Sequence, residues 1–337
     1  MSRMQAPIQI TRTGPGLCWL ALATIAIGGV GLPVAAQPGA LTKPVTVIVT
    51  FPPGAATDTF ARLAARRMTE LLGQQVVVMN RDGAGGIIGT NFAAKAQPDG
   101  YTLLWGTSGP MTISAAWMEK LPYDVANDFT PIGVFTTIPF FLVTHPSLPV
   151  KNVKELVALA KSQPGKLNYA SGGVGGISHF AAELFKEMAK INVTHVPYRG
   201  TAIFETELIS GQVEMAFVSP TVAQRNVNSG RLKALAATDI KRSSVFPEVP
   251  TMKEAGVTNY QFTQWYGLLG PAKLPPALVS QFNAALMKSL DDPEVRKRVV
   301  AEGGTIAANT PEQFAAAYKA ELAQYEKIIK AAGLKVQ

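Results

Sequence analysis

Strand-like and helix-like stretches alternate along almost the whole chain, and this alternation constrains the fold more than any other feature. Amphipathic stretches predict helices, and the first of them places its apolar residues on one face. Short apolar runs between them are predicted as strands, at Val45–Thr50, Val76–Met79, Thr102–Trp105, Leu142–Thr144, Leu167–Ala170, Val193–Val196, Met215–Val218, Leu232–Ala236 and Tyr266–Leu269. Alternation of this kind predicts an α/β protein with a largely parallel sheet.

The N-terminal residues indicate export. Arg3 and Arg12 precede an uncharged apolar run, Leu17–Leu32, which is followed by small residues ending at Ala36. This is the pattern of a signal peptide, here 1–36, and the run is too short and glycine-rich for a membrane span. The single cysteine, Cys18, lies inside this segment. We therefore expect a mature protein without thiols or disulfides.

The remaining length, about 300 residues, is enough for two ordinary domains. Proline pairs at Pro146/Pro149 and Pro247/Pro250 interrupt the alternating pattern twice. They suggest a middle region inserted between two outer ones. We predict that 37–140 and 241–337 build the first lobe and that 141–240 builds the second, which is the connectivity of a hinged pair.

The charge of the chain is mildly basic. The net charge is +8, and it falls to +6 when Arg3 and Arg12 are removed with the signal peptide. The basic residues are scattered, with short runs only at Arg66-Arg67 and Arg296–Arg298. This distribution does not predict nucleic-acid binding, although it favours anionic ligands.

Four loops follow the carboxyl ends of predicted strands, which is the edge where open α/β sheets bind ligands. They are 51–58, 106–110, 171–176 and 198–201. The first and third lead directly into helices, at about Thr57 and Ile177. The leading N–H groups of a helix lack internal partners and carry the positive end of its dipole, so they can hold an anion. Two such helix starts, one in each lobe, would form a clamp for a carboxylate.

Aromatic residues at strand ends are more often core than pocket. Phe51 and Tyr198 flank the chosen loops and are the stronger pocket candidates, ahead of Trp105 and Trp265.

Other kinds of site are poorly supported. The glycine-rich segment 83–89 has Ile88 where a dinucleotide fingerprint needs its third glycine, and the chain contains no Gly-x-x-x-x-Gly-Lys-Ser/Thr phosphate loop. Neither Ser108 nor Ser171 lies in a nucleophile elbow. We therefore predict no cofactor, and an exported hydrolase on the same architecture is the competing interpretation.

The chain has three histidines, His145, His179 and His195. His179 lies just inside a helix start and is the least ordinary of them, but packing or a hydrogen bond to the loop explains it more readily than catalysis. No set of histidines and acids shows metal-ligand spacing. We predict no catalytic residue and no metal site.

From Thr42 to its end the chain resembles the tripartite tricarboxylate transporter receptor family, also called the Bug periplasmic binding proteins. The matching segments are Phe51-Pro-Pro-Gly54 with Thr57-Asp58, Asn80-Arg81 with 83–86, 98–103, 121–124, 164–171, Ser178-His179, 195–200, 265–268 and 310–314. The resemblance implies a type II periplasmic binding protein, with two α/β lobes and a ligand cleft between them. It also implies a periplasmic location, an organic acid as ligand and integral membrane permease subunits as partners, and we expect a monomer.

The resemblance assigns roles to the loops. Loops 51–58 and 106–109 hold one carboxylate through backbone groups, and 171–178 with Tyr198 meets the rest of the ligand. The predicted ligand-binding residues are Phe51, Gly54, Ala55, Ala56, Asp58, Thr107, Ser108, Gly109, Ser171, Gly172, Gly175, Ser178, Tyr198 and Ser219.

Departures from the family pattern bear on the ligand. Gly54-Ala55-Ala56 replaces Gly-Gly-Ser, 171–177 lacks several hydroxyls and an amide, and Phe217-Val218-Ser219 replaces Phe-Asp-Asn. The aspartate of the family pattern would pair with the ammonium group of a ligand. Because this chain lacks that aspartate, an amino acid is disfavoured as the ligand. We expect a more apolar pocket for an aromatic or short aliphatic mono- or dicarboxylate, delivered to a transporter or, alternatively, sensed for a signalling partner.

Overall fold

The computed structural model describes residues 41–331 of the 337-residue chain. They belong to one unit, Pro38–Gln337. The predicted signal peptide and its cleavage site after Ala36 lie outside the described residues. Within 41–331, none of the helices combines the length and the apolar character needed to cross a membrane.

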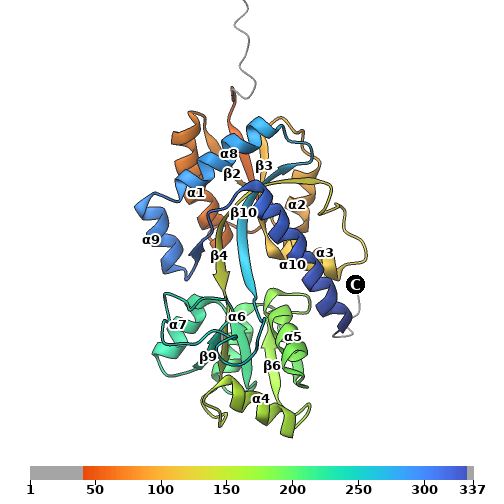
Figure 1. Cartoon of the computed structure of the whole chain (residues 1–337), viewed down its shortest axis with the longest axis vertical. Coiled ribbons are helices and arrows are strands. Elements are labelled where there is room, and N and C mark those ends of the chain that lie inside the picture. The colour runs from red at the N-terminus through yellow and green to blue at the C-terminus, as the bar shows by residue number, and fades with distance from the viewer. Residues whose placement is uncertain (1–40, 332–337) are drawn as a thin grey trace, which may run out of the picture. The chain divides into compact units, whose positions relative to one another are not determined.

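The first sheet has six strands in the order β11-β4-β10-β3-β1-β2 (Figure 1). β1 pairs in parallel with β2 and with β3, whereas β10 is antiparallel to both β3 and β4, and β11 is antiparallel to β4. The strands are β1 Val45–Val49, β2 Val76–Asn80, β3 Thr102–Thr107, β4 Phe129–Pro139, β10 Thr263–Pro271 and β11 Thr305–Ile306.

The second sheet has five strands in the order β7-β6-β8-β5-β9. β6 pairs in parallel with β7 and β8, and β5 is antiparallel to β8 and β9. The strands are β5 Phe141–Thr144, β6 Asn168–Ser171, β7 Thr194–Pro197, β8 Met215–Val218 and β9 Lys233–Ala237. Both sheets are therefore mixed, and the expectation of a largely parallel sheet is wrong. The strands that connect the sheets, β4, β5 and β10, supply the antiparallel pairs.

The chain crosses between the sheets twice. β4 ends at Pro139 and β5 begins at Phe141, so only Phe140 separates them. The return path ends at Phe262, just before β10. Thr238 joins the two crossings, because its Oγ1 accepts the N–H of Phe140 at 2.7 Å and donates to the carbonyl oxygen of Phe262 at 2.5 Å.

The segment 241–262 packs with the second sheet. Met252, Val257 and Tyr260 belong to the apolar cluster that contains residues of that sheet, and Thr251 forms a β-bridge with Ala237. The chain re-enters the first sheet at Thr263, which lies after the boundary expected at 240.

β4 is the long strand that the sequence pattern did not predict. Its sequence, FTPIGVFTTIP, contains two prolines and a glycine, which usually interrupt strands. Within the part of the chain that the structure describes, β4 pairs with β10 and otherwise only with the two-residue β11, at Thr136 and Thr137. Most backbone N–H groups on the outer edge of β4 therefore have no neighbouring strand to which they could donate. Pro131, which lacks an N–H, is tolerated there for this reason.

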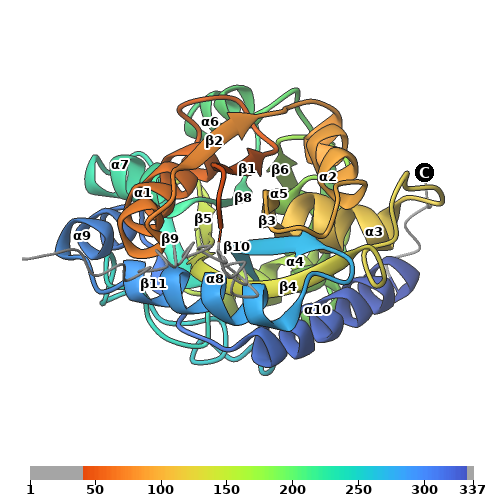
Figure 2. The same ribbon diagram turned by 90° about the horizontal axis from the view of Figure 1, so that it is seen from above.

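Helices surround the two sheets (Figure 2). Several helices begin and end at residues whose local geometry explains the boundary. The N–H of Glu155 donates to Asn152 Oδ1 at 2.9 Å, and Gly73 ends the first helix with φ +65°. The helices are α1 Ala56–Leu72, α2 Ile87–Ala94, α3 Ser114–Trp117, α4 Val153–Ser162, α5 Ile177–Ala189, α6 Thr201–Ile209, α7 Pro220–Asn228, α8 Pro276–Ser289, α9 Pro293–Ala301 and α10 Pro311–Ala331, with a 3-10 turn η1 Ala84–Gly86 and a π-helical turn η2 Gly109–Ile113.

Two elements that begin beside the first sheet also pack into the core of the second. Ile113 and Trp117, at the end of η2 and α3, join the apolar cluster around β6 and α5. Tyr325, from α10, joins the same cluster and lies 5.9 Å from the rings of Phe180 and Phe262. Movement of the two sheets relative to each other would therefore disturb these contacts.

Candidate ligand-binding site

The loop between β1 and α1 is held by a buried carboxylate. Asp58, with a side chain only 5% exposed, accepts the N–H of Gly54 at 3.0 Å and also pairs with Arg62 and Asn80. Asn80 in turn donates to the carbonyl oxygen of Phe51 at 2.9 Å. Burial opposes ionisation, yet the hydrogen bonds from Arg62, Gly54 and Asn80 hold the pKa of Asp58 below its ordinary value. Asp58 therefore stays charged and fixes the shape of the loop.

The start of α1 offers backbone donors. The helix begins at Ala56 with no side-chain cap at Ala55. Among residues 41–331, the N–H groups of Ala56, Thr57 and Asp58 have no hydrogen-bond partner, as expected for a first helical turn without a cap. The small side chains of Ala55 and Ala56 leave these groups approachable.

The loop after β3 is more buried than the others. Thr107 and Ser108 are fully buried, and Ser108 Oγ accepts the N–H of Trp265 at 3.0 Å. Thr107 Oγ1 has no partner among the described residues. A buried hydroxyl without a partner is costly, so a ligand or a water molecule is expected to complete it. Gly109, half-buried, then begins η2.

The turn between β6 and α5 is held from both sides. Ser171 Oγ accepts the N–H of Gly173 at 3.2 Å, and Ser178 Oγ accepts the N–H of Gly172 at 3.2 Å. Nδ1 of His179 accepts the N–H of Gly175, also at 3.2 Å. The turn then leads into α5 at Ile177. Gly176 occupies the N-cap position and provides no side chain to cap the helix.

The first turn of α5 matches that of α1. In the described part of the chain, the N–H groups of Ile177, Ser178 and His179 have no hydrogen-bond partner. Both predicted helix starts, at about Thr57 and at Ile177, are confirmed in position, since α1 begins at Ala56 and α5 at Ile177. Their role in binding a ligand stays a prediction.

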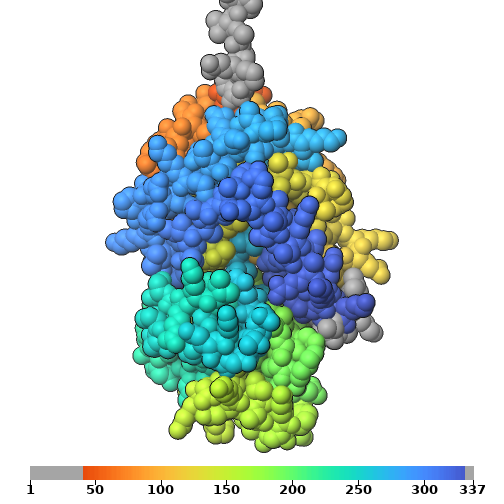
Figure 3. All heavy atoms as spheres, viewed as in Figure 1, coloured from red at the N-terminus to blue at the C-terminus, as the bar shows by residue number. Residues whose placement is uncertain are grey.

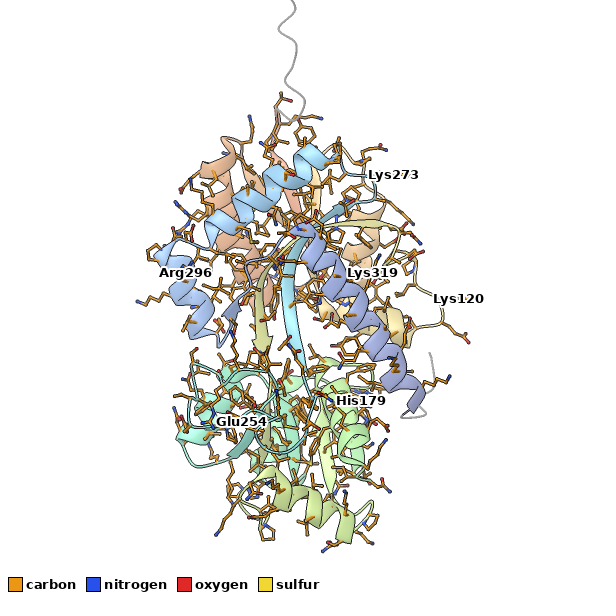
Figure 4. All side chains as sticks on the ribbon, in the orientation of Figure 1. Lys120, His179, Glu254, Lys273, Arg296 and Lys319 are labelled. Atoms are coloured by element: carbon orange, nitrogen blue, oxygen red, sulfur yellow. The ribbon has the colours of Figure 1, made fainter. Side chains whose placement is uncertain are left out.

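A stack of aromatic rings supports the α5 turn from behind. The ring of His179, at the start of α5 (Figure 4), stacks on His195 at 4.1 Å, and Tyr169 stacks on His195 at 4.7 Å. Nε2 of His195 lies 2.7 Å from Ser171 Oγ. The hydroxyl of Tyr169 donates to the buried carboxylate of Glu183. The expectation that His179 packs and hydrogen-bonds to the loop is confirmed.

Both stacked histidines are neutral near pH 7. Burial, with a smaller effect of Lys186, lowers the pKa of His179 to about 4. Burial and then the neighbouring His179 lower the pKa of His195 to about 4. A neutral ring is required at His179, because Nδ1 must carry a lone pair to accept the N–H of Gly175.

The loops after β7 and β8 lie beside the α5 turn. Tyr198 donates its N–H to the carbonyl oxygen of Ser171 at 3.0 Å, and Gly200 donates to that of Gly172 at 3.1 Å. Tyr198 is half-buried. Ser219 follows β8, the other neighbour of β6, and its Oγ lies 3.2 Å from Thr221 Oγ1.

The predicted residues thus form two groups, one at the edge of each sheet. β1 and β3 are parallel neighbours, so loops 51–58 and 107–109 lie side by side. β6 is a parallel neighbour of β7 and of β8, which brings together 171–178, Tyr198 and Ser219. Of the two weaker aromatic candidates, Trp105 is a core residue, 1% exposed and edge-on to Phe135, and Trp265 is also buried, at 6% exposed.

Sequence reasoning missed one residue that connects the groups. Trp117, on α3 beyond the 107–109 loop, contacts the α5 turn: a Cβ added at Gly175 would lie 3.2 Å from Trp117 Nε1. Its ring is also edge-on to His179 at 6.1 Å. Nothing in the local sequence around Trp117 signals this contact, because it depends on how α3 meets α5.

Comparison with known proteins identifies the family. The model described as the tripartite tricarboxylate transporter family receptor matches residues 60–334. The chain belongs to this family. Among curated relatives, BugT of Bordetella pertussis is 33% identical over 314 residues, which cover 93% of this chain and 96% of BugT.

Solved structures of this receptor family share the fold. Rpa4515 of R. palustris, solved with adipate, is 33% identical, with a TM-score of 0.73 and coverage of 87% of this chain and 98% of that one. MatC of Rhodopseudomonas palustris, solved with bound malate, is 33% identical, with a TM-score of 0.71 and coverage of 86% and 99%. The predicted two-lobed fold of periplasmic solute receptors is therefore confirmed, and relatives in the family bind carboxylates.

Proposed function

We propose that this chain is a periplasmic receptor that captures a small organic carboxylate between its two sheets and delivers it to a tripartite tricarboxylate-type transporter. The observation that carries the proposal is the pair of unpartnered helix starts, at Ala56 and Ile177, each in a turn fixed by its own side chains. Fixed N–H groups bind an oxyanion without the cost of ordering charged side chains. Family membership supports the same function.

The side chains beside these N–H groups favour an apolar ligand body. Ala55, Ala56 and Ile177 carry only hydrocarbon, and Val174, 50% exposed, lies on the α5 turn. The family pattern has an acid at the position of Val218, and in this chain Val218 is buried in an apolar cluster. We infer a preference for aromatic or short aliphatic mono- or dicarboxylates over amino acids, whose ammonium group would lack a counter-charge.

Calorimetric titration of the ligand-stripped protein tests this proposal. The panel consists of benzoate, adipate, malate, aspartate and glutamate, and the amides of benzoate and adipate serve as matched uncharged controls. We expect one-to-one binding of benzoate or adipate and none of their amides. Tight binding of aspartate or glutamate without any response to benzoate and adipate would contradict the inferred ligand class.

The hydrolase alternative has one observation in its favour. Ser171 Oγ and His195 Nε2 are 2.7 Å apart, which is the separation of a nucleophile and its base. However, Ser171 is fully buried, and its Oγ also donates to the carbonyl oxygen of Gly173 at 3.1 Å. Ester hydrolysis by the wild type and by Ser171→Ala separates the two functions. Turnover that disappears in Ser171→Ala would establish an enzyme, whereas we expect no turnover in either protein.

A further inference from the structure

A cavity of about 330 Å³ lies beside α10 and the strands that cross between the sheets. Figure 3 shows the hollow along α10, which is dark blue, and Figure 2 shows α10 and α6 on opposite sides of β10. None of the predicted ligand-binding residues lines this cavity. Its walls come from β4, β10, α10 and the segment before β10: Val134, Thr137, Gln261, Phe262, Thr263, Trp265, Phe314, Ala317, Tyr318, Ala320, Glu321, Gln324 and Tyr325.

The cavity contains one carboxylate, that of Glu321. Trp265 Nε1 donates to Oε2 at 2.6 Å, Thr112 Oγ1 donates to the same oxygen at 3.0 Å, and the Tyr325 hydroxyl donates to Oε1 at 3.1 Å. Among the ion pairs of the described residues, none includes Glu321. Lys319, exposed on the same helix (Figure 4), does not pair with it. When ionised, Glu321 therefore carries a negative charge without a counter-ion.

Titration of Glu321 falls near neutral pH. Glu321 is half-buried, and the loss of hydration raises its pKa to about 7, whereas hydrogen bonds from Trp265 and Thr112 act against this rise. The titratable groups beside it are the hydroxyls of Tyr318 and Tyr325, and burial raises the pKa of both, so they remain neutral. η2 and β10 contribute only the neutral donors Thr112 and Trp265.

Three largely buried aromatic residues, Trp265, Phe314 and Tyr318, line one part of the cavity. Trp265 is edge-on to Phe314 at 77° and to Tyr318 at 76°, and Phe314 and Tyr318 meet at 68°. Aromatic faces attract cations, and the attraction grows when water is excluded. Because the carboxylate already accepts three hydrogen bonds, a ligand gains more from charge than from further N–H donors. A quaternary ammonium ion, which has no N–H, matches this environment.

We infer that this cavity is a second binding site, for a small organic cation of the quaternary ammonium class, centred on Glu321 and walled by Trp265, Phe314 and Tyr318. Its volume lies at the lower end of the range of small-molecule pockets.

The site is connected to the predicted carboxylate loop. Ser108 accepts the N–H of Trp265 through Oγ at 3.0 Å, and Thr112 Oγ1, whose single proton is shared with Glu321, lies 2.9 Å from the carbonyl oxygen of Ser108. The cavity wall also includes Phe262 and Thr263, on either side of the point where the chain re-enters the first sheet. The cavity therefore adjoins both the predicted carboxylate loop and the second crossing.

Titration calorimetry of the full mature chain with tetramethylammonium chloride tests the site directly. Sodium chloride at the same concentration controls for ionic strength, and tert-butanol serves as a neutral ligand of similar shape. With a pKa of about 7, Glu321 is about one-tenth ionised at pH 6 and about nine-tenths ionised at pH 8. We expect saturable one-to-one binding of tetramethylammonium that is about tenfold tighter at pH 8 than at pH 6.

Three variants define the outcome. Glu321→Gln removes the charge, and Ala317→Phe fills the cavity without altering the carboxylate; each should weaken tetramethylammonium binding at pH 8 at least tenfold. Glu326→Gln, exposed on the same helix, should bind as the wild type does. Absence of saturable binding at pH 8, equal affinity at pH 6 and pH 8, or wild-type binding by both Glu321→Gln and Ala317→Phe would overturn the inference. These measurements need no carboxylate ligand, so their failure would leave the proposed receptor function intact.

Discussion

Nδ1 of His179 accepts the backbone N–H of Gly175, so a side chain in the first turn of α5 fixes the loop that precedes this helix. The same arrangement occurs in the other sheet, where the carboxylate of Asp58 accepts the N–H of Gly54. In both cases a residue inside the helix holds the loop before it. The remaining N–H groups at the helix start stay free and are presented in a fixed direction.

Replacement of His179 separates loop support from catalysis. His179→Ala leaves the N–H of Gly175 without a partner and a gap against Trp117, and it should lower the free energy of unfolding by about 2–4 kcal/mol. His179→Asn, whose amide oxygen can replace Nδ1, should lose less. Urea unfolding measures both effects. Calorimetry should show weakened but detectable carboxylate binding for His179→Ala, and wild-type stability of this variant would contradict the supporting role.

The buried histidines predict acid sensitivity. The pKa of His179 and of His195 is about 4, below the ordinary value of 6.5. Between these values the unfolded chain binds more protons than the folded chain, so the free energy of unfolding should fall as the pH is lowered from about 6.5 to about 4. Glu321, with a raised pKa of about 7, contributes in the opposite direction between about 4.5 and 7.

Comparison of variants isolates the contribution of the histidine. The free energy of unfolding of His179→Asn should depend less on pH between 6.5 and 4 than that of the wild type, because one of the buried groups no longer titrates. Urea unfolding at several pH values measures this difference. Parallel pH profiles for the two proteins would show that His179 does not carry the effect.

The buried Asp58 should matter more for stability than the exposed Asp82. Asp58→Ala removes an acceptor for Gly54, Arg62 and Asn80, so it should lower the free energy of unfolding by about 1–3 kcal/mol and weaken carboxylate binding. Asp82 is exposed just after β2, and Asp82→Ala should change stability by less than about 0.5 kcal/mol. Equal effects of the two substitutions in thermal unfolding would refute the assigned role of Asp58.

Two glycines of the α5 turn provide a matched pair. Gly175 has φ +75°, and a Cβ there would lie 3.2 Å from Trp117 Nε1. Gly172 has no positive φ, and its nearest neighbour would be at 3.6 Å. Gly175→Ala should therefore destabilise the fold by about 1–2 kcal/mol and weaken carboxylate binding, whereas Gly172→Ala should be nearly neutral for stability. Chemical unfolding and ligand titration of both variants measure the contrast; a reversed order of stability would show that the turn is not held as described.

Local sequence patterns were reliable for short elements whose signals lie within a few residues. The nine predicted strands correspond to β1–β3 and β5–β10, and the helix starts at Thr57 and Ile177 are correct within one residue. β4 was not predicted because Pro131 and Pro139 are typical of a loop. Only the pairing with β10 makes this segment a strand. The second crossing was placed too early because segment 241–262 joins the second sheet through Met252 and Tyr260, and this packing has no signal in the local sequence.

The sequence by itself determined the alternation of strands and helices, the glycine-rich turns and the free N–H groups at the starts of α1 and α5, because these depend on residues close together in the chain. Only the tertiary structure decided that both sheets are mixed, that Trp117 touches the α5 turn, and that Glu321 lies in a cavity beside Trp265. Such contacts depend on how distant elements pack, and no local pattern of residues encodes that packing.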